Sequence, residues 1–98
     1  MKNHTKVYLR GIGVTKLENF DDMYIECETC PYNKAVDVHH IEPRGMGGSK
    51  ERDVIENLMG LCRQCHMMAE AKEYKKEYLI SIHKQFLASI QKWKPFQK

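Results

Sequence analysis

The sequence predicts a small α+β domain stapled by a zinc ion, and three observations lead to that prediction. The chain has 98 residues, enough for one domain but too few for a core that is more than marginal by itself. It carries two Cys-x-x-Cys pairs. A stretch rich in β-branched residues precedes the second pair and a long stretch of helix formers follows it. We therefore expect a single domain over residues 1–98.

Three short stretches are predicted to be strands. Residues 6–10 alternate in part between polar and apolar side chains and end at Gly11, which indicates an N-terminal strand. Residues 35–41 are rich in β-branched side chains and stop before Pro43, which cannot donate to a sheet. Residues 55–61 return as a second strand of this core and lead into the second cysteine pair.

A C-terminal amphipathic helix is predicted over about residues 73–92. Apolar residues recur there mostly at three- and four-residue spacing, and they are Tyr74, Tyr78, Leu79, Ile82, Phe86 and Ile90. We interpret this stripe as core, with a partner surface as the alternative, and expect His83 on the helix surface. Whether residues 63–92 form one helix or two is left open.

The four cysteines, Cys27, Cys30, Cys62 and Cys65, predict a structural zinc site. A two-residue gap suits a turn that brings two thiolates onto one ion, and two such turns complete a closed tetrahedron. Disulfides would be expected in a secreted protein, but the N-terminus shows no apolar stretch typical of an export signal. Two redox pairs, or cysteines placed by chance, are the alternatives.

Composition excludes few classes of function. No apolar run approaches the roughly 20 residues of a membrane-spanning helix, so we expect no membrane partner and a cytoplasmic location. Residues 1–20 carry four Lys or Arg against one acid, residues 21–60 four against nine, and residues 61–98 eight against three. Basic ends can meet phosphate and an acidic middle can hold cations, but an unevenly charged solvated surface would give the same pattern.

Three histidines and one glutamate predict an open cation site. His39 and His40 are consecutive strand residues and point to opposite faces, so one can bind an ion while the other acts as a base. His66 follows the last cysteine, and Glu70 lies one helical turn later on the same face. Imidazole and carboxylate together suit Zn, Mn, Ni or Mg.

These residues resemble one known family. The string Cys27-x-x-Cys30 … His39-His40-Ile41-x-Pro43 … Gly47-Gly48 … Asn57-Leu58-x-x-Leu61-Cys62-x-x-Cys65-His66 is similar to HNH endonucleases, which have a ββα-metal (His-Me finger) core. The resemblance covers about residues 27–70, nearly half of the chain. It implies a motif core there, with the C-terminal helix as an extension.

The resemblance also implies a role for each matching residue. His40 corresponds to the general base, and Asn57 to the residue that hydrogen-bonds the backbone between the strands. His39 and His66 correspond to ligands of a catalytic divalent cation, which can be Mg, Mn, Ni or Zn. Glu70 stands where some members have a further histidine ligand, so its part as a ligand is the weakest. The four cysteines correspond to the structural zinc ligands of many members.

The function implied is metal-dependent hydrolysis of DNA phosphodiester bonds, by nicking or double-strand cleavage, leaving 5′-phosphate and 3′-hydroxyl ends. Arg44 and Lys50, beside the glycine loop, are candidate phosphate contacts or else ordinary loop charges. DNA is the expected partner, and a protein partner such as a packaging or restriction component fits small HNH proteins. The alternative function is a non-catalytic DNA-binding or protein-interaction zinc module.

Overall fold

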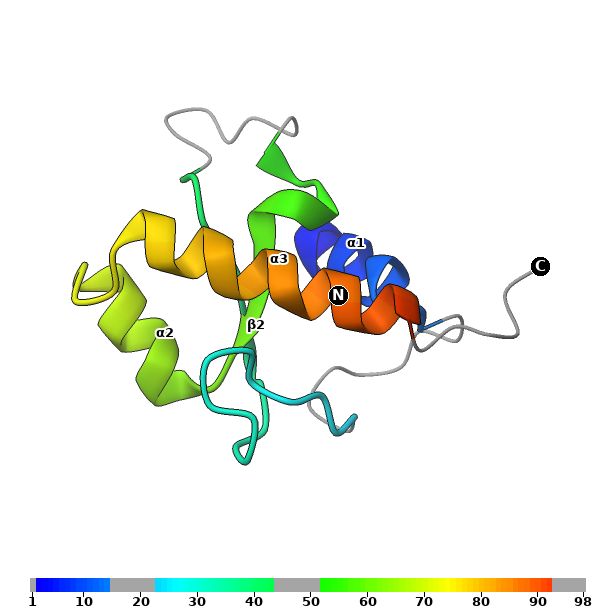
Figure 1. The fold of residues 1–98 in the computed structure, drawn as a ribbon, viewed down its shortest axis with the longest axis horizontal. Coiled ribbons are helices and arrows are strands. Elements are labelled where there is room, and N and C mark those ends of the chain that lie inside the picture. Colours follow the sequence, from blue (N-terminus) through cyan, green and yellow to red (C-terminus); the bar gives the residue numbers. More distant parts are fainter. Residues whose placement is uncertain (1, 15–22, 44–51, 93–98) are drawn as a thin grey trace.

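A computed structural model describes residues 2–14, 23–43 and 52–92 of the chain. Its architecture is the small α+β fold that the sequence predicts, with one two-stranded sheet and three α-helices among these residues. Figure 1 shows the long C-terminal helix crossing in front of the strands. The elements in chain order are α1 (Asn3–Gly11), β1 (Asp37–His40), the 3-10 helix η3 (Ile55–Asn57), β2 (Leu58–Leu61), α2 (Arg63–Glu70) and α3 (Lys76–Lys92).

The sheet is an antiparallel pair of β1 and β2. Val38 lies opposite Gly60, and His39 lies opposite Met59. Both strands are shorter than the sequence predicts, and β2 begins only at Leu58 because residues 55–57 form η3. This coil places Asn57 at the entrance to β2, where its main-chain oxygen accepts a hydrogen bond from Ile41 N–H at 2.9 Å.

The N-terminal strand predicted over residues 6–10 is wrong, because these residues belong to α1. Tyr8 and Leu9 are neighbours in the chain, and both are fully buried against the sheet. A strand would direct such neighbours to opposite faces, whereas a helix can bury both on one side. Gly11 lies at the end of α1 against Ile55, where a Cβ atom would come within 2.5 Å of that side chain.

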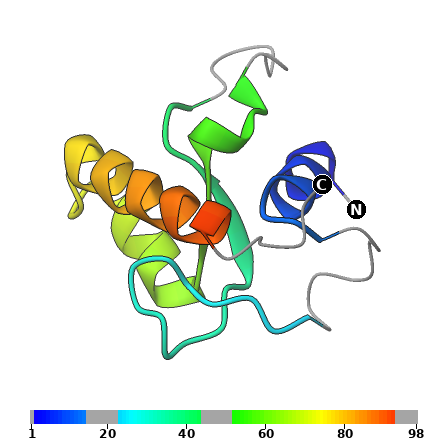
Figure 2. The same cartoon turned by 45° about the vertical axis from the view of Figure 1, so that its right-hand side comes forward.

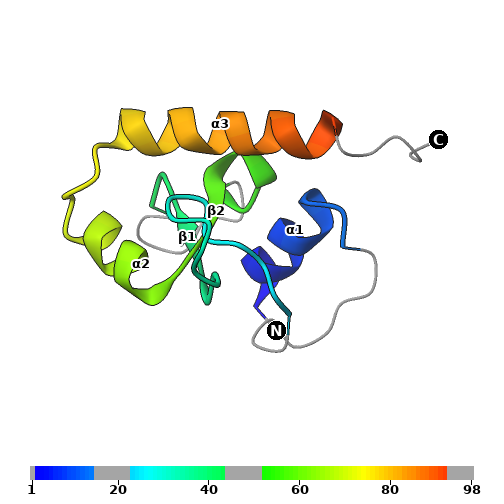
Figure 3. The same cartoon turned by 60° about the horizontal axis from the view of Figure 1, so that its bottom comes forward.

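Helices cover both faces of the hairpin. On one face Tyr8 and Leu9 of α1 pack against Val38 and Leu58, and on the other the apolar side chains of α2 and α3 pack against Ile41, Met59 and Leu61. Figures 2 and 3 show α1 on one side of the strands and α2 on the other, and Figure 3 shows α3 running over both. Successive residues of β1 therefore face different helices, which decides the surroundings of its two histidines.

Residues 63–92 form two helices, which settles the point that the sequence leaves open. The side chain of Cys62 caps α2 by accepting a hydrogen bond from Cys65 N–H at 3.5 Å. The chain then turns at Lys72, whose φ of 63° lies in the left-handed region, before α3 begins. None of the helices in the described part of the chain is long and apolar enough to cross a membrane.

The position predicted for His83 on the helix surface is also wrong, because this side chain is only 2% exposed. His83 follows the buried Leu79 by four residues and precedes the half-buried Phe86 by three. It therefore lies on the apolar side of α3. There its ring contacts Glu28, a residue between the first two cysteines.

Candidate functional site

The four cysteines converge at one point, although the two pairs are more than 30 residues apart in the chain. Sγ of Cys30 lies 3.9 Å from Cys27, 3.6 Å from Cys62 and 3.4 Å from Cys65. A tetrahedral zinc ion with Zn–S bonds of about 2.3 Å has its sulfur atoms about 3.8 Å apart. All four cysteines are free thiols, so the cluster fits a closed zinc site.

The thiols in this cluster differ in acidity because their hydrogen bonds differ. Burial raises the pKa of Cys27, but hydrogen bonds from Thr29 and from backbone N–H groups outweigh burial and bring this pKa down to about 7. Burial and the neighbouring thiols of Cys65 and Cys62 raise the pKa of Cys30 to about 12. A cation at the centre would replace the thiol protons and remove the repulsion between neighbouring thiolates.

A second cluster joins β1 to α2. His39, His66 and Glu70 each offer a ligand atom, and these atoms lie within 4.8 Å of one another. Nδ1 of His39 is 3.6 Å from Oε2 of Glu70, and the rings of His39 and His66 meet edge to face at 5.2 Å. The carboxylate of Glu70 is 66% exposed, so the cluster is open to solvent on one side. Nitrogen and oxygen ligands of this kind suit a divalent cation that also keeps exchangeable waters.

The protonation state of His39 fits this donor set. Burial lowers its pKa, the electrostatic interactions with His66 and His40 lower it further, and the interaction with Glu70 raises it. The net effect is a pKa below the usual value of the imidazole. His39 is therefore neutral at pH 7 and has a lone pair available for a metal ion.

Asp37 supports the second cluster, and sequence reasoning missed it. Its Oδ2 lies 3.1 Å from Nδ1 of His66 and also accepts a hydrogen bond from Nε of Arg63 at 2.9 Å. A carboxylate on one ring nitrogen fixes the orientation of the imidazole and leaves Nε2 as the ligand atom. Its place two residues before His39, on the same face of the strand, is the signal that could have found it.

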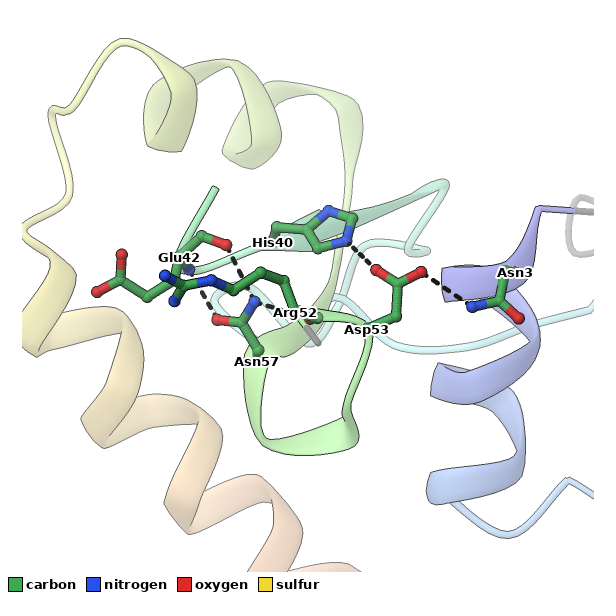
Figure 4. Close-up of polar contacts among 6 residues, drawn as sticks. All are labelled: Asn3, His40, Glu42, Arg52, Asp53 and Asn57. Atoms are coloured by element: carbon green, nitrogen blue, oxygen red, sulfur yellow. Dashed lines mark hydrogen bonds and ion pairs between the residues drawn. The ribbon is translucent and has the colours of Figure 1, made fainter. Parts of the chain in front are cut away.

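His40 lies on the other face of β1, in a different setting. Its Nε2 is 2.7 Å from Oδ1 of Asp53, whose other oxygen accepts a hydrogen bond from Asn3 Nδ2 at 2.9 Å (Figure 4). The ring of His4 also packs against His40, with the ring centroids 4.7 Å apart. Asp53 is almost fully buried, and no sequence pattern links it to His40, because the two lie 13 residues apart in the chain.

Asn57 ties together the backbone segments that surround His40. Its Oδ1 accepts a hydrogen bond from Glu42 N–H at 2.7 Å, and its Nδ2 donates to Glu42 O at 3.0 Å and to Arg52 O at 2.9 Å. Figure 4 shows this amide between the segment that follows β1 and the segment that carries Asp53. The side chain therefore fixes the distance between His40 and its carboxylate partner.

One cleft of about 840 Å³ brings the two histidines of β1 within reach of the same solvent space. The cleft is lined by His39, His40, His66 and Glu70. Lys72, Lys75 and Lys76 line it as well, and these lysines were not among the residues predicted for the site. The feature of the sequence that points to these lysines is the excess of basic over acidic residues in 61–98. Arg44 and Lys50, the predicted phosphate contacts, lie outside the described residues.

Comparison with known families identifies the part of the chain that carries these clusters. Residues 27–72 match the sequence model of the family described as HNH endonuclease. No curated protein and no solved structure matches the chain. The matched segment contains all four cysteines and both histidines of β1, together with Asn57, His66 and Glu70. Residues 27–72, nearly half of the chain, therefore carry the sequence signature of an HNH endonuclease domain.

Proposed function

We propose that this protein is a metal-dependent endonuclease that hydrolyses DNA phosphodiester bonds. The observation that carries the proposal is the arrangement along β1. His40, held by a buried carboxylate, and the cation-type cluster of His39, His66 and Glu70 open onto one cleft. A phosphodiester in that cleft would lie between a base and a divalent cation, which is the arrangement that hydrolysis needs.

In this proposal His40 takes a proton from the attacking water. Its Nε2 donates to Asp53, so Nδ1 keeps the lone pair that accepts the proton. Asp53 then stabilises the imidazolium that forms, because a buried carboxylate faces the ring. Asn57 positions the base, since it joins the backbone on both sides of the His40–Asp53 contact.

His39, His66 and Glu70 would hold the divalent cation, and Asp37 would orient His66. When bound, such an ion acts as a Lewis acid on the phosphate and stabilises charge on the leaving 3′ oxygen. Mg, Mn, Ni and Zn all remain candidates for this ion. Lys72, Lys75 and Lys76 supply positive charge at the cleft for the DNA backbone.

The four thiols would hold the structural zinc in a tetrahedron. Thiol ligands stay reduced in the cytoplasm, which supports a cytoplasmic location. Packing of α1 and α3 against the hairpin supports one nuclease domain over residues 1–98. The alternative of a non-catalytic zinc module leaves the buried partner of His40 without a purpose, so the contacts favour the enzyme.

Cleavage of supercoiled plasmid tests the proposal. Wild type, His40→Ala and Gln64→Ala would be incubated in EDTA and then with Mg, Mn, Ni, Co or Zn. Gln64 is exposed on α2 and lines no part of the cleft, so its variant is the matched control. We expect metal-dependent nicking or linearisation by wild type and control, and a loss of about 10²–10⁴-fold in His40→Ala. Equal rates in all three proteins would overturn the assignment of the base.

A further inference from the structure

A third group of metal-ligating side chains lies on the face of the sheet that α1 covers. His4 of α1, His40 of β1 and Asp53 of the segment before η3 each offer one ligand atom, and these atoms lie within 4.8 Å of one another. The group is separate from the cysteine cluster and from the cluster of His39, His66 and Glu70. His4 also lies outside the segment that matches the HNH family.

We propose that His4, His40 and Asp53 form a binding site for a divalent transition-metal ion, and that occupation of this site blocks the catalytic base. Two imidazoles and one carboxylate are a donor set for Zn, Ni or Cu. Mg prefers six oxygen ligands, several of them water, so it competes poorly for two ring nitrogens. The proposed site would therefore bind Zn, Ni or Cu in preference to Mg.

The contacts around the site prepare it for an ion. Nε2 of His40 and Oδ1 of Asp53 are already 2.7 Å apart, and Asn3 holds the other oxygen of Asp53 at 2.9 Å. The rings of His4 and His40 pack against one another at an interplanar angle of 57°, with their centroids 4.7 Å apart. The Asp53 carboxylate is 1% exposed and His40 is 15% exposed, so two ligands are fixed in a low-dielectric setting. His4 stands in the first turn of α1 and closes the third side.

Binding would change which nitrogen of His40 carries the proton. In the hydrogen-bonded form the proton sits on Nε2, between the ring and Asp53, and Nδ1 has a free lone pair. An ion that takes Nε2 and Oδ1 displaces that proton, and the neutral ring then carries its hydrogen on Nδ1. The ring can no longer accept a proton from water at that atom. This consequence for activity rests on the proposed nuclease function, whereas the site itself does not.

Zinc bound per folded chain, counted by native mass spectrometry, tests the site without any activity. His4→Phe keeps a ring against His40 but removes the ligand atom, and His66→Gln is the matched control that removes a ligand of the other histidine cluster. At saturating zinc, we expect each single variant to lose one zinc ion relative to wild type, and the double variant to lose two. Equal counts in wild type and His4→Phe overturn the site. If His4→Phe does not fold, His4→Gln replaces it in the same comparison.

The effect on the base is tested by titrating zinc into cleavage reactions that contain saturating Mg. Each protein is compared with its own rate in Mg alone, because His4 touches the base and can affect that rate. We expect the half-inhibitory zinc concentration to rise at least tenfold in His4→Phe. An unchanged concentration means that zinc inhibits elsewhere and overturns the blocking role. If wild type cuts DNA with no metal, the proposed function and this blocking role both fail, while the zinc count still decides the site.

Discussion

Nδ1 of His83 lies 2.7 Å from Oε1 of Glu28, and this contact joins two buried side chains that are 55 residues apart. The opposite ring nitrogen is 2.6 Å from the carbonyl oxygen of Ile55, which can only accept, so that nitrogen carries a proton. Oε2 of Glu28 accepts hydrogen bonds from Tyr8 Oη at 2.7 Å and from Gly60 N–H at 3.2 Å. One buried pair thus connects α1, the first cysteine turn, β2 and α3.

The His83–Glu28 pair predicts a fall in stability at alkaline pH. Burial lowers the pKa of His83, but its bonds to Glu28 and to the Ile55 carbonyl outweigh burial and raise it. The stabilisation is therefore fully present below the unfolded pKa of about 6.5 and is lost as the pH rises through the raised folded pKa. It amounts to about 1.4 kcal/mol for each unit by which the pKa is raised.

Urea unfolding from pH 6 to pH 9, with zinc saturating throughout, measures this contribution. The reference is the double variant Glu28→Gln/His83→Gln, which keeps side chains of similar size and removes both titrating groups. We expect the difference in free energy of unfolding between wild type and the double variant to fall as the pH rises. A difference that stays constant across this range would contradict the assignment of a charged pair.

The cysteine cluster predicts that folding depends on metal. Cys62→Ser removes one thiolate from the tetrahedron and also the sulfur that caps α2. Because structural zinc can supply on the order of 10 kcal/mol of folding free energy, we expect the variant to lose bound zinc and its cooperative thermal transition. Circular dichroism melts and zinc analysis check this result. The prediction fails if the variant melts as wild type does.

Asp53→Asn is expected to slow cleavage with little change in the fold. The amide is similar in size and can still accept a bond from His40, but it cannot stabilise the imidazolium. We expect kcat to fall by about 10²-fold or more while KM for DNA stays near that of wild type. Asn3→Ala, which removes only the bond to the outer oxygen of Asp53, serves as the milder comparison. A change confined to KM would show that Asp53 contributes to DNA binding instead.

Asp37→Asn is expected to weaken the affinity for the catalytic cation. Loss of a carboxylate behind a histidine ligand typically costs about 10–100-fold in metal affinity. The activating concentration of Mn should rise by that factor, and the rate at saturating Mn should recover. Arg63→Gln is the matched control, because Arg63 contacts Asp37 from the exposed side and reaches no ligand of the cluster. Equal effects of the two substitutions would argue for a loss of general surface charge.

The sequence predicted the parts of the site that depend on local spacing. Alternation along a strand separates His39 from His40, and one helical turn brings Glu70 close to His66. Both arrangements are present in the structure. Two-residue gaps likewise brought the cysteines together. These relationships could be predicted because each depends on the geometry of one element.

Relationships between distant segments could not be predicted in this way. Asp53 meets His40 across a separation of 13 residues, and Glu28 meets His83 across 55 residues because α3 crosses the hairpin. Partial alternation of polar and apolar side chains over residues 6–10 predicts a strand there, although the residues form a helix. Ile12 follows Tyr8 by four residues and Leu9 by three and packs against the same cluster, which is the spacing of a helix.

The helix that carries His4, α1, limits how far the chain can be trimmed. The segment that matches the family, residues 27–72, includes the hairpin and α2 but neither α1 nor α3. A fragment trimmed to that segment would expose Val38 and Leu58, which α1 covers, and would lose Leu79 of α3 from the cluster on the other face. Such a fragment would aggregate even with every ligand in place. A fragment that keeps the hairpin covered must therefore be longer than the segment that matches the family.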